Sequence, residues 1–172
     1  MAELIPVLTQ EDLSRIIADL AEKISNDYKD RDLVLIGMLK GAFIFMADLA
    51  RMLTIPVHIS FLKASSYGQG TVSSKDPLLT GDLAAEVRGR DVLIVEDIVD
   101  TGITLVKVLE HMQSLSPCSV EICALIDKRE RREREVAVRY AGRVLHSGFL
   151  VGYGLDYAED YRHLPEIFTL NL

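Results

Sequence analysis

Tryptophan is absent from this sequence of 172 residues, and cysteine occurs only twice, at Cys118 and Cys123. The two cysteines lie five positions apart in a segment predicted to be one strand, so their side chains should point to opposite faces. We therefore expect no disulfide between them. No CxxC pair and no spacing typical of a zinc site exists either. Core packing is the expected role of both cysteines.

A basic leader and a long apolar run are also missing. The N-terminal stretch MAELIPVLTQED has no basic segment followed by an apolar run, so we predict no signal peptide. The longest apolar run, near Phe43, is broken by Asp48 and is too short to cross a bilayer. The sequence thus predicts a cytoplasmic protein with no membrane partner.

Basic residues are in deficit. The chain has 19 Lys and Arg against 26 Asp and Glu, which gives a formal net charge of −7. This balance argues against a protein that binds nucleic acid mainly by neutralising phosphates. It leaves open a small anionic ligand held by local donors or by a metal ion. The four histidines are scattered without metal-ligand spacing.

Apolar runs alternate with segments of helical periodicity along the chain. We predict strands over 32–39, 56–67, 91–97 and 119–128, helices over 10–28, 42–53 and 101–115, and a return to β structure over 143–156. Near-continuous apolar strands that alternate with helices are typical of an α/β fold with a parallel sheet covered on both faces. The length suits one domain, residues 1–172.

Ligands of such sheets bind beyond the carboxyl ends of the strands. This rule brings together four segments, each of which follows a predicted strand: Lys40-Gly41, the Ser- and Gly-rich loop 65–76, Glu96 to Thr104, and Lys128. The loop is long for a compact domain, and such loops usually carry function. We therefore expect one cleft to be built from distant parts of the chain.

The stretch VLIVEDIVDTGIT contains neither of the common nucleotide fingerprints, GxxxxGK[ST] and GxGxxG. Instead, Glu96 and Asp97 follow directly on an apolar strand. Ionised carboxylates only accept hydrogen bonds, so they suit vicinal hydroxyls, as on a ribose, or a Mg²⁺ ion. Charges are costly beside a buried strand, which favours a binding site over ordinary acidic capping of the next helix.

The turn Asp100 to Thr104 precedes the next predicted helix. Gly102 allows a backbone geometry or a close approach that a β-carbon would hinder. Successive N–H groups, with the hydroxyls of Thr101 and Thr104, would form a nest for a phosphate monoester. A ligand with a phosphate at one end and a diol in its middle, a ribose 5-phosphate, would use both halves of this stretch. The alternative is a helix N-terminus with ordinary caps.

The same stretch resembles the phosphoribosyl-pyrophosphate-binding motif of type I phosphoribosyltransferases, and Asp100 matches the acid of their purine-salvage branch. Four further motifs are similar to hypoxanthine-guanine phosphoribosyltransferases: LKG at 39–41, SSYG at 65–68, DK at 127–128 and FLVGYGLDYAEDYR at 149–162. The matches span residues 39–162 in the family's order. Two positions depart from the pattern, because Ile103 stands where a polar residue is common and Gly154 where alanine is usual.

The resemblance implies a fold and an activity. The fold is that of type I phosphoribosyltransferases, a central mostly parallel sheet flanked by helices, with a small hood formed by the N-terminal residues and about 143–172, and a lid at about 65–80. The activity is transfer of the 5-phosphoribosyl group from phosphoribosyl pyrophosphate to hypoxanthine, and to guanine, which gives IMP or GMP and pyrophosphate. The family suggests a homodimer or homotetramer.

The resemblance also implies individual roles. Asp100 would take the proton of a purine ring nitrogen as general base, and Lys128 would donate to the exocyclic oxygen of a 6-oxopurine. Phe149 would stack on the purine, and Leu150 would offer backbone groups to its edge. The residues expected to bind substrate are Lys40, Gly41, Ser66, Tyr67, Glu96, Asp97, Asp100, Thr101, Gly102, Ile103, Thr104, Lys128, Phe149, Leu150 and Arg162.

The implied cofactor is Mg²⁺, which would neutralise the departing pyrophosphate. Its expected ligands are Glu96, Asp97 and Asp156. Arg162 would pair with pyrophosphate oxygens, and a cis peptide bond is implied between Leu39 and Lys40. The segment with Ser66 and Tyr67 would close over the leaving group.

Three alternatives stay open. The first concerns Lys128, which begins the charged run KRERRERE: its side chain belongs to a solvated charged face instead of the base site. For the remainder of the run, Arg129 to Glu135, we expect such a solvated face. A non-catalytic, nucleotide-sensing regulator on the same fold is a second interpretation, although a nucleic-acid-binding module should show a basic face. A xanthine-preferring or adenine-using phosphoribosyltransferase is the third.

Overall fold

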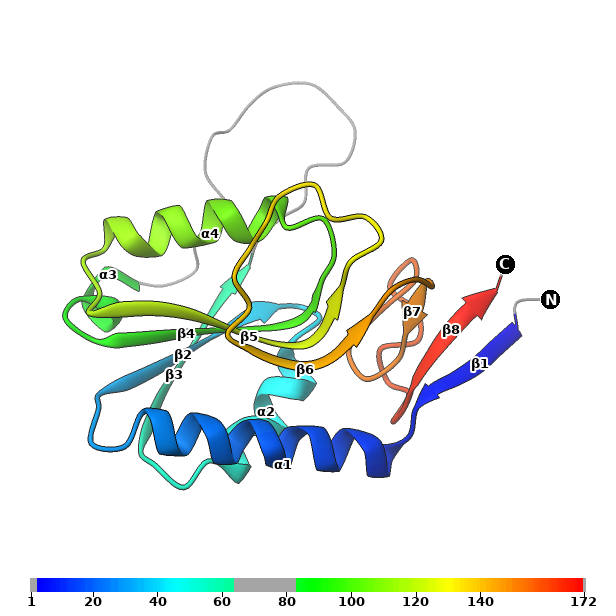
Figure 1. The fold of residues 1–172 in the computed structure, drawn as a ribbon, viewed down its shortest axis with the longest axis horizontal. Coiled ribbons are helices and arrows are strands. Elements are labelled where there is room, and N and C mark those ends of the chain that lie inside the picture. Colours follow the sequence, from blue (N-terminus) through cyan, green and yellow to red (C-terminus); the bar gives the residue numbers. More distant parts are fainter. Residues whose placement is uncertain (1–2, 64–82, 172) are drawn as a thin grey trace.

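The computed structural model describes residues 3–63 and 83–171. Its centre is a five-stranded sheet with the order β3-β2-β4-β5-β6, in which every neighbouring pair of strands is parallel (Figure 1). The strands of this sheet are β2 (Leu33–Leu39), β3 (Val57–Lys63), β4 (Asp91–Val99), β5 (Ser119–Lys128) and β6 (Tyr140–Leu145). The predicted α/β class and parallel sheet are confirmed.

The helices cover both faces of the sheet. In Figure 1, α1 and α4 lie on opposite sides of it. The helices are α1 (Gln10–Asp27), α2 (Phe43–Met52), α3 (Leu83–Val87) and α4 (Ile103–Ser114). Side chains of α1 and α2 belong to one apolar cluster, and those of α3 and α4 belong to a second.

Alternation along the central strands feeds both clusters. Leu33 and Leu35 of β2 pack with the α1 and α2 side, whereas Val34 and Ile36 pack with the α3 and α4 side. All four of these side chains are fully buried. Successive strand residues point to opposite faces, so a strand that is apolar at every position must be covered twice.

Helix α1 has clear start signals. The Thr9 hydroxyl accepts from the Asp12 N–H, and the Asp12 carboxylate accepts from the Thr9 N–H, which makes a capping box. Buried apolar residues such as Leu13, Ile17 and Leu20 then recur at helical spacing and face the sheet.

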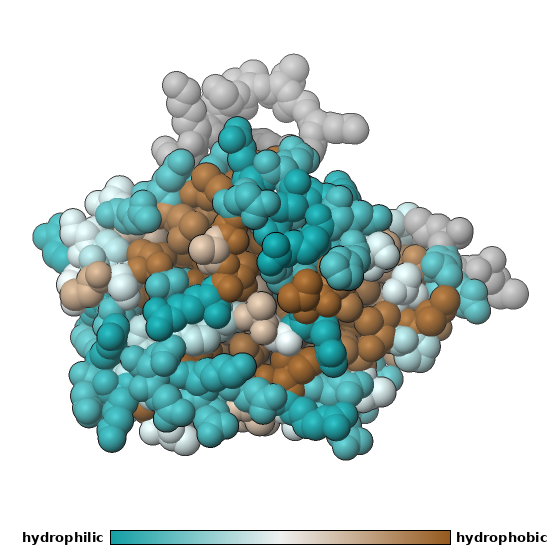
Figure 2. Space-filling model, viewed as in Figure 1, coloured by the Kyte–Doolittle hydropathy of each residue, from teal (hydrophilic) through white to brown (hydrophobic). Residues whose placement is uncertain are grey.

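A second, antiparallel sheet joins the two ends of the chain. Its strands, in the order β1-β8-β7, are β1 (Glu3–Leu8), β7 (Leu150–Val151) and β8 (Ile167–Asn171). We call these strands and the segment between β7 and β8 the hood. It lies beyond one end of the main sheet (Figure 1). Figure 2 shows apolar surface along this end. Leu4 and Ile5 of β1 are among the exposed apolar residues of the protein.

The hood formed by terminal segments agrees with the predicted type I phosphoribosyltransferase fold. Residues Arg143 to Leu145 pair with β5, so they belong to the main sheet rather than to the hood. The short strands β1 and β8 lie in segments that gave no strand pattern, and β6 begins inside the mixed-charge segment 132–140. Within residues 3–63 and 83–171, no helix is both long and apolar enough to cross a bilayer.

The expectation for the cysteines was half right. Both are free thiols, as predicted, and Cys123 is buried in β5. Cys118, however, precedes the first residue of β5 and is exposed, so its expected core packing was wrong. Its thiol donates to the Gly89 carbonyl.

The main sheet divides at its carboxyl edge. Pairing between β2 and β4 ends at Gly37 and Val95. The β2–β3 ladder continues to Leu39 and Lys63, and the β4–β5 ladder continues to Val99 and Asp127. The chain also reverses its direction of travel across the sheet between β2 and β4, which is the switch point where open α/β sheets bind ligands.

We predict that Gly152→Ala will destabilise the protein more than Gly89→Ala. Both glycines have positive φ, +94° and +71°, which costs an alanine about 1 to 2 kcal/mol. A β-carbon on Gly152 would also lie 2.1 Å from the Glu166 carbonyl oxygen, whereas one on Gly89 would meet no atom within 4 Å. The clash should add about 1 to 3 kcal/mol to the loss in urea unfolding. Equal losses for the two variants would show that the hood tolerates the contact.

Candidate active site

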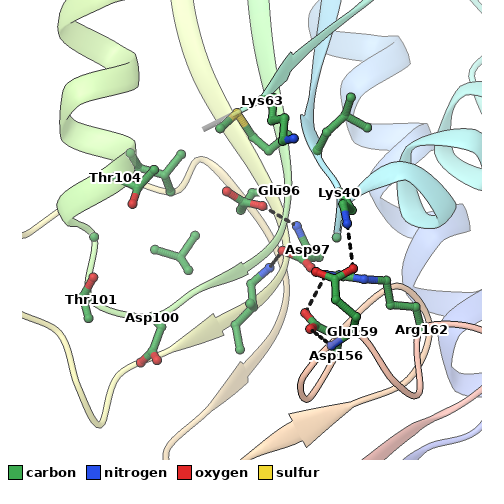
Figure 3. Close-up of a pocket in the computed structure, with 17 residues that line it drawn as sticks. Lys40, Lys63, Glu96, Asp97, Asp100, Thr101, Thr104, Asp156, Glu159 and Arg162 are labelled. Carbon is green, nitrogen blue, oxygen red and sulfur yellow. Dashed lines mark hydrogen bonds and ion pairs between the residues drawn. The ribbon is translucent and has the colours of Figure 1, made fainter. Parts of the chain in front are cut away.

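A cavity of about 450 Å³ opens where β2 and β4 separate. Its walls come from the segment after β2, the end of β4 with the turn into α4, the last residue of β3, and the hood (Figure 3). Most of the predicted site residues line it: Lys40, Gly41, Glu96, Asp97, Asp100, Thr101, Gly102, Thr104, Asp156 and Arg162. Residues as far apart in the sequence as Lys40 and Arg162 thus meet at one edge of the sheet, as expected.

Glu96 and Asp97 lie inside β4, at the point where β2 leaves it. The Asp97 N–H donates to Glu96 Oε1 at 3.1 Å, and the Ile98 N–H donates to Asp97 Oδ1 at 2.8 Å. Burial raises the pKa of Glu96 well above its ordinary value, and the adjacent Asp97 carboxylate raises it further. Burial also raises the pKa of Asp97, against its hydrogen bonds. The pair therefore favours ligands that donate hydrogen bonds or bring positive charge.

Gly41 and Gly154 allow three segments to touch beside this pair. A β-carbon on Gly41 would lie 1.8 Å from Asp97 Oδ2, and one on Gly154 would lie 2.1 Å from the Gly41 carbonyl oxygen. Gly154 also has a φ of +99°, which favours glycine. The departure from alanine at Gly154 thus accompanies close packing of the hood against the loop after β2. The peptide bond between Leu39 and Lys40 is cis, as the resemblance implied.

The turn from β4 into α4 presents backbone donors to the cavity. Gly102 is the N-cap of α4 and has a φ of +82°. The first amides of a helix have no intrahelical acceptor, and the helix dipole favours an anion there. Thr101 and Thr104 line the cavity beside them, whereas the partly exposed Ile103 side chain does not. A β-carbon on Gly102 would lie 2.2 Å from the Arg134 carbonyl oxygen, so the glycine lets the β5–β6 segment pack against the turn.

The carboxylate of Asp100 lies between two basic groups. Lys128 Nζ is 4.0 Å from Asp100 Oδ1, and Arg131 Nη1 is 3.6 Å from Oδ2. Asp100 Oδ1 is buried and has no hydrogen-bond partner among the described residues. Lys128 is itself only 6% exposed at the end of β5. A buried acceptor beside a buried ammonium is a place where a ligand can complete the hydrogen bonding.

Cations and acids of the hood and the loop after β2 form the opposite wall. Lys40 Nζ binds Glu159 Oε2 at 2.7 Å, and Arg162 Nη2 lies 3.4 Å from Glu159 Oε1 (Figure 3). Arg162 also pairs with Asp156 at 2.8 Å and donates to the Gly154 carbonyl. The hydrogen bond from Lys40 is the main cause that lowers the pKa of Glu159. Glu159 therefore occupies donors that were predicted to bind pyrophosphate.

Six of the predicted substrate residues do not line the cavity or lie outside the described residues; one of them is Ile103. Lys128 does not line the cavity but lies 4.0 Å from Asp100, which does. Leu150 lies in β7 of the hood, and Phe149 directly precedes β7. Phe149 is 45% exposed and contacts Tyr157 edge to face, with ring centroids 5.5 Å apart. Ser66 and Tyr67, with the predicted lid at about 65–80, lie outside the described residues.

The interpretation of Arg129 to Glu135 as a solvated face was wrong for Arg132. Its side chain is only 5% exposed and pairs with Asp127, which is 2% exposed. Arg132 also binds main-chain carbonyls at the ends of β4 and β5. The charged run gave no sign of this burial. The one signal was Asp127, an acid in an apolar strand that needs a buried partner.

Glu159 and Lys63 were also missed, although both line the cavity. Glu159 stands in an acidic stretch and Lys63 ends an apolar strand. The position of Lys63 at a strand's carboxyl end was the available signal. No sequence pattern set Glu159 apart from its neighbours.

Comparison with known proteins agrees with this geometry. The family described as "Phosphoribosyl transferase domain" matches residues 7–158. The chain is 45% identical to a hypoxanthine phosphoribosyltransferase of Salmonella typhimurium, over 94% of this chain and 92% of that protein. It is 44% identical to a hypoxanthine-guanine phosphoribosyltransferase of Staphylococcus epidermidis, over 95% and 92%.

Solved structures show the same architecture. A hypoxanthine-guanine phosphoribosyltransferase from Bacillus anthracis superposes with a TM-score of 0.90 at 36% identity, over 99% of this chain and all of that one. The family match, the full-length identity and the shared fold lead to one conclusion: this chain belongs to the phosphoribosyltransferase family.

Proposed function

We propose that this protein transfers the 5-phosphoribosyl group from phosphoribosyl pyrophosphate to hypoxanthine, and to guanine. The products would be IMP or GMP and pyrophosphate. The observation that carries this proposal is the environment of Asp100. Its buried Oδ1 has no hydrogen-bond partner among the described residues, lies 4.0 Å from Lys128 Nζ, and stands at the start of the turn into α4. The names of the full-length relatives support the choice of base.

The base would bind between Asp100 and Lys128. A 6-oxopurine offers an exocyclic oxygen, which accepts from the Lys128 ammonium, and a ring N–H, which donates to Asp100. An adenine amino group offers Lys128 no comparable acceptor, so the site selects against adenine. Asp100 would then take the ring proton as the neighbouring nitrogen attacks C1 of the ribose. Phe149 and Leu150 are proposed to contact the face and edge of the purine.

The sugar phosphate would extend from the turn before α4 to the two acids inside β4. Its 5-phosphate would bind the amides of Asp100 to Thr104, including that of Ile103, with the hydroxyls of Thr101 and Thr104. The ribose hydroxyls would donate to Glu96 and Asp97. Burial raises the pKa values of these two carboxyls by disfavouring their charged forms, and hydrogen bonds from hydroxyls would stabilise those forms.

Mg²⁺ fits this donor set as a substrate-borne ion. Among residues 3–63 and 83–171, no cluster of three or more His, Cys, Asp or Glu is arranged to hold a metal. Mg²⁺ commonly binds through one or two carboxylates together with phosphates and water, so a closed protein cage is not required. Asp156, Glu96 and Asp97 would supply those carboxylates, directly or through water. The ion would neutralise charge on the leaving pyrophosphate.

The pyrophosphate would bind the loop after β2 and the hood. Lys40, the Gly41 backbone and Arg162 supply positive charge and donors there, with Ser66 and Tyr67 proposed to join them. In the structure Lys40 and Arg162 hold Glu159 instead. Binding of pyrophosphate would therefore exchange an internal anion for an external one.

An assay with each purine base, phosphoribosyl pyrophosphate and Mg²⁺ tests the function directly. IMP formation from hypoxanthine supports it, and product from xanthine alone would favour the xanthine-preferring alternative. Absence of any nucleotide product would favour the non-catalytic regulator. The net charge of −7 counts against a nucleic-acid partner. A homodimer or homotetramer and a cytoplasmic location stay predictions.

We predict that Asp100→Asn will lower kcat for hypoxanthine about 10² to 10⁴-fold, because an amide takes no proton from the base. The dissociation constant for phosphoribosyl pyrophosphate should change little, since the sugar contacts remain. Steady-state kinetics and calorimetry check the two parts, with Asp19→Asn, on the exposed side of α1, as control. Near-normal kcat in Asp100→Asn would remove the general-base role.

Lys128→Ala should lower kcat/KM for hypoxanthine about 10 to 100-fold, the effect of losing one hydrogen bond from a charged donor. Affinity for phosphoribosyl pyrophosphate should stay within about twofold, because Lys128 is proposed to contact only the base. Lys107→Ala, an exposed lysine of α4, is the matched control. If Lys128→Ala behaves like Lys107→Ala, Lys128 has no part in base selection.

Glu159→Gln should strengthen binding of pyrophosphate. The substitution replaces the carboxylate that pairs with Lys40 and Arg162 by a neutral amide, so pyrophosphate would compete with a weaker internal partner. Exposed ion pairs contribute about 1 kcal/mol or less, so the gain should be about two- to fivefold in the inhibition constant of pyrophosphate. Asp160→Asn, one residue further along the hood, is the control. Weaker inhibition in Glu159→Gln would mean that Glu159 supports the site rather than competes for it.

A further inference from the structure

The β5–β6 segment carries one buried arginine. Arg132 Nε donates to the Asp100 carbonyl at 2.9 Å, and its Nη2 donates to the carbonyls of Val99 at 3.2 Å and Lys128 at 3.0 Å. Nη2 also donates to the Asp127 carboxylate. The side chain is 5% exposed. One guanidinium thus touches the main chain of two neighbouring strands at their carboxyl ends.

These contacts begin where the pairing between β4 and β5 ends. The β4–β5 ladder ends at the pair Val99 and Asp127, so Asp100 and Lys128 each lie one residue beyond it. No ladder bond fixes the distance between those two residues. The Arg132 guanidinium, a planar fork of donors, bridges the two strands in place of the next ladder bonds.

The neighbouring backbone holds the following residue in another way. The N–H groups of Glu133 and Arg134 both donate to the Thr101 carbonyl, at 3.0 and 2.9 Å. The phosphate-binding half of the turn therefore has its own main-chain support. A change of the Arg132 side chain should release Asp100 while Thr101 stays tied.

A purely structural role for Arg132 does not account for this arrangement. Its Nη1 is buried without a hydrogen-bond partner among the described residues. A buried ion pair with an unsatisfied donor is an unfavourable way to stabilise a loop. Arg129 also binds Asp127, through Nε and Nη2, but it is half exposed and its side chain donates to none of the carbonyls of Val99, Asp100 and Lys128 among the hydrogen bonds of the described residues.

We propose that Arg132 is a positioning residue that sets the separation of Asp100 and Lys128, and thereby aligns the purine between general base and ammonium. This inference rests on the proposed function, because it assigns those two residues to the base. Arg132 touches no substrate in this account. It acts through the carbonyls of Val99, Asp100 and Lys128.

The test compares Arg132→Lys with Arg129→Lys. Lysine keeps the positive charge beside Asp127, but its single ammonium does not reproduce the fork that spans both strand ends. We expect Arg132→Lys to lower kcat for hypoxanthine at least tenfold while the dissociation constant of phosphoribosyl pyrophosphate changes less than about threefold. Arg129→Lys should leave both within twofold.

Three results for Arg132→Lys would overturn the proposal: a kcat within twofold of the wild-type value, a loss of phosphoribosyl-pyrophosphate affinity as large as the loss of kcat, or failure to fold. The first removes any role, and the second means that the whole turn has collapsed. The third makes Arg132 a residue of the core. The wild-type protein is assayed in parallel. If it forms no IMP, the proposed function itself has failed; if it forms IMP, the results for Arg132→Lys bear on the positioning role alone.

Asp127→Asn supplies a second, independent variant. It removes the buried negative charge but leaves an acceptor for Nη2 and does not alter the bonds to Val99 and Asp100. Positioning by the strand-end bonds predicts a kcat within about threefold of the wild-type value. A loss equal to that of Arg132→Lys would show that charge balance, rather than the bridge between strands, sustains turnover, and would also overturn the proposal.

Discussion

The separation of β2 from β4 beyond Gly37 and Val95 is the constraint on which the site depends. Up to that point β4 is paired on both edges, and Val92 to Val95 are covered on both faces, so these four residues are apolar and buried. Beyond it, one edge of β4 faces the cavity while the other stays paired with β5. A strand that is half in the sheet and half in a binding site can carry Glu96 and Asp97 without leaving the ladder.

The same division explains how the charges are placed. The cavity has acids on β4 and the turn after it, and both cations and acids on the hood and the loop after β2. These acids have different environments. Glu96 and Asp97 are desolvated and hold protons more readily than free carboxyls, whereas Glu159 is held by Lys40 and Arg162 and gives up its proton more readily. Asp100 stands between Lys128 and Arg131. These differences allow one cavity to meet hydroxyls, phosphate groups and a purine at separate places.

Much of the fold follows from local patterns. Strands such as Leu33–Leu39 are apolar throughout because helices cover both faces. This continuous apolar run predicts the strand from the sequence alone. The sequence pattern did not predict the hood strands β1 and β8. They are short, and their stability comes from pairing with each other across nearly the whole chain. Predicting β4 to end near Glu96 and Asp97 made it too short, since parallel pairing with β5 carries it on to Val99.

The site was predictable where a motif joins residue type to strand end, as at Glu96 to Thr104 and at Lys128. It was not predictable where burial arises from tertiary contacts alone. Arg132 looks like any other residue of KRERRERE, and only the positions of Asp127 and the strand-end carbonyls make it a buried residue. Glu159 is likewise distinguished only by the cations that the fold brings to it.

A crystal structure of the protein with IMP tests the central claim most directly. The account predicts that the phosphate binds the amides of Asp100 to Thr104, that the ribose hydroxyls face Glu96 and Asp97, and that the purine oxygen meets Lys128. A phosphate bound at Lys40 and Arg162 instead, or a purine placed away from Asp100, would contradict it.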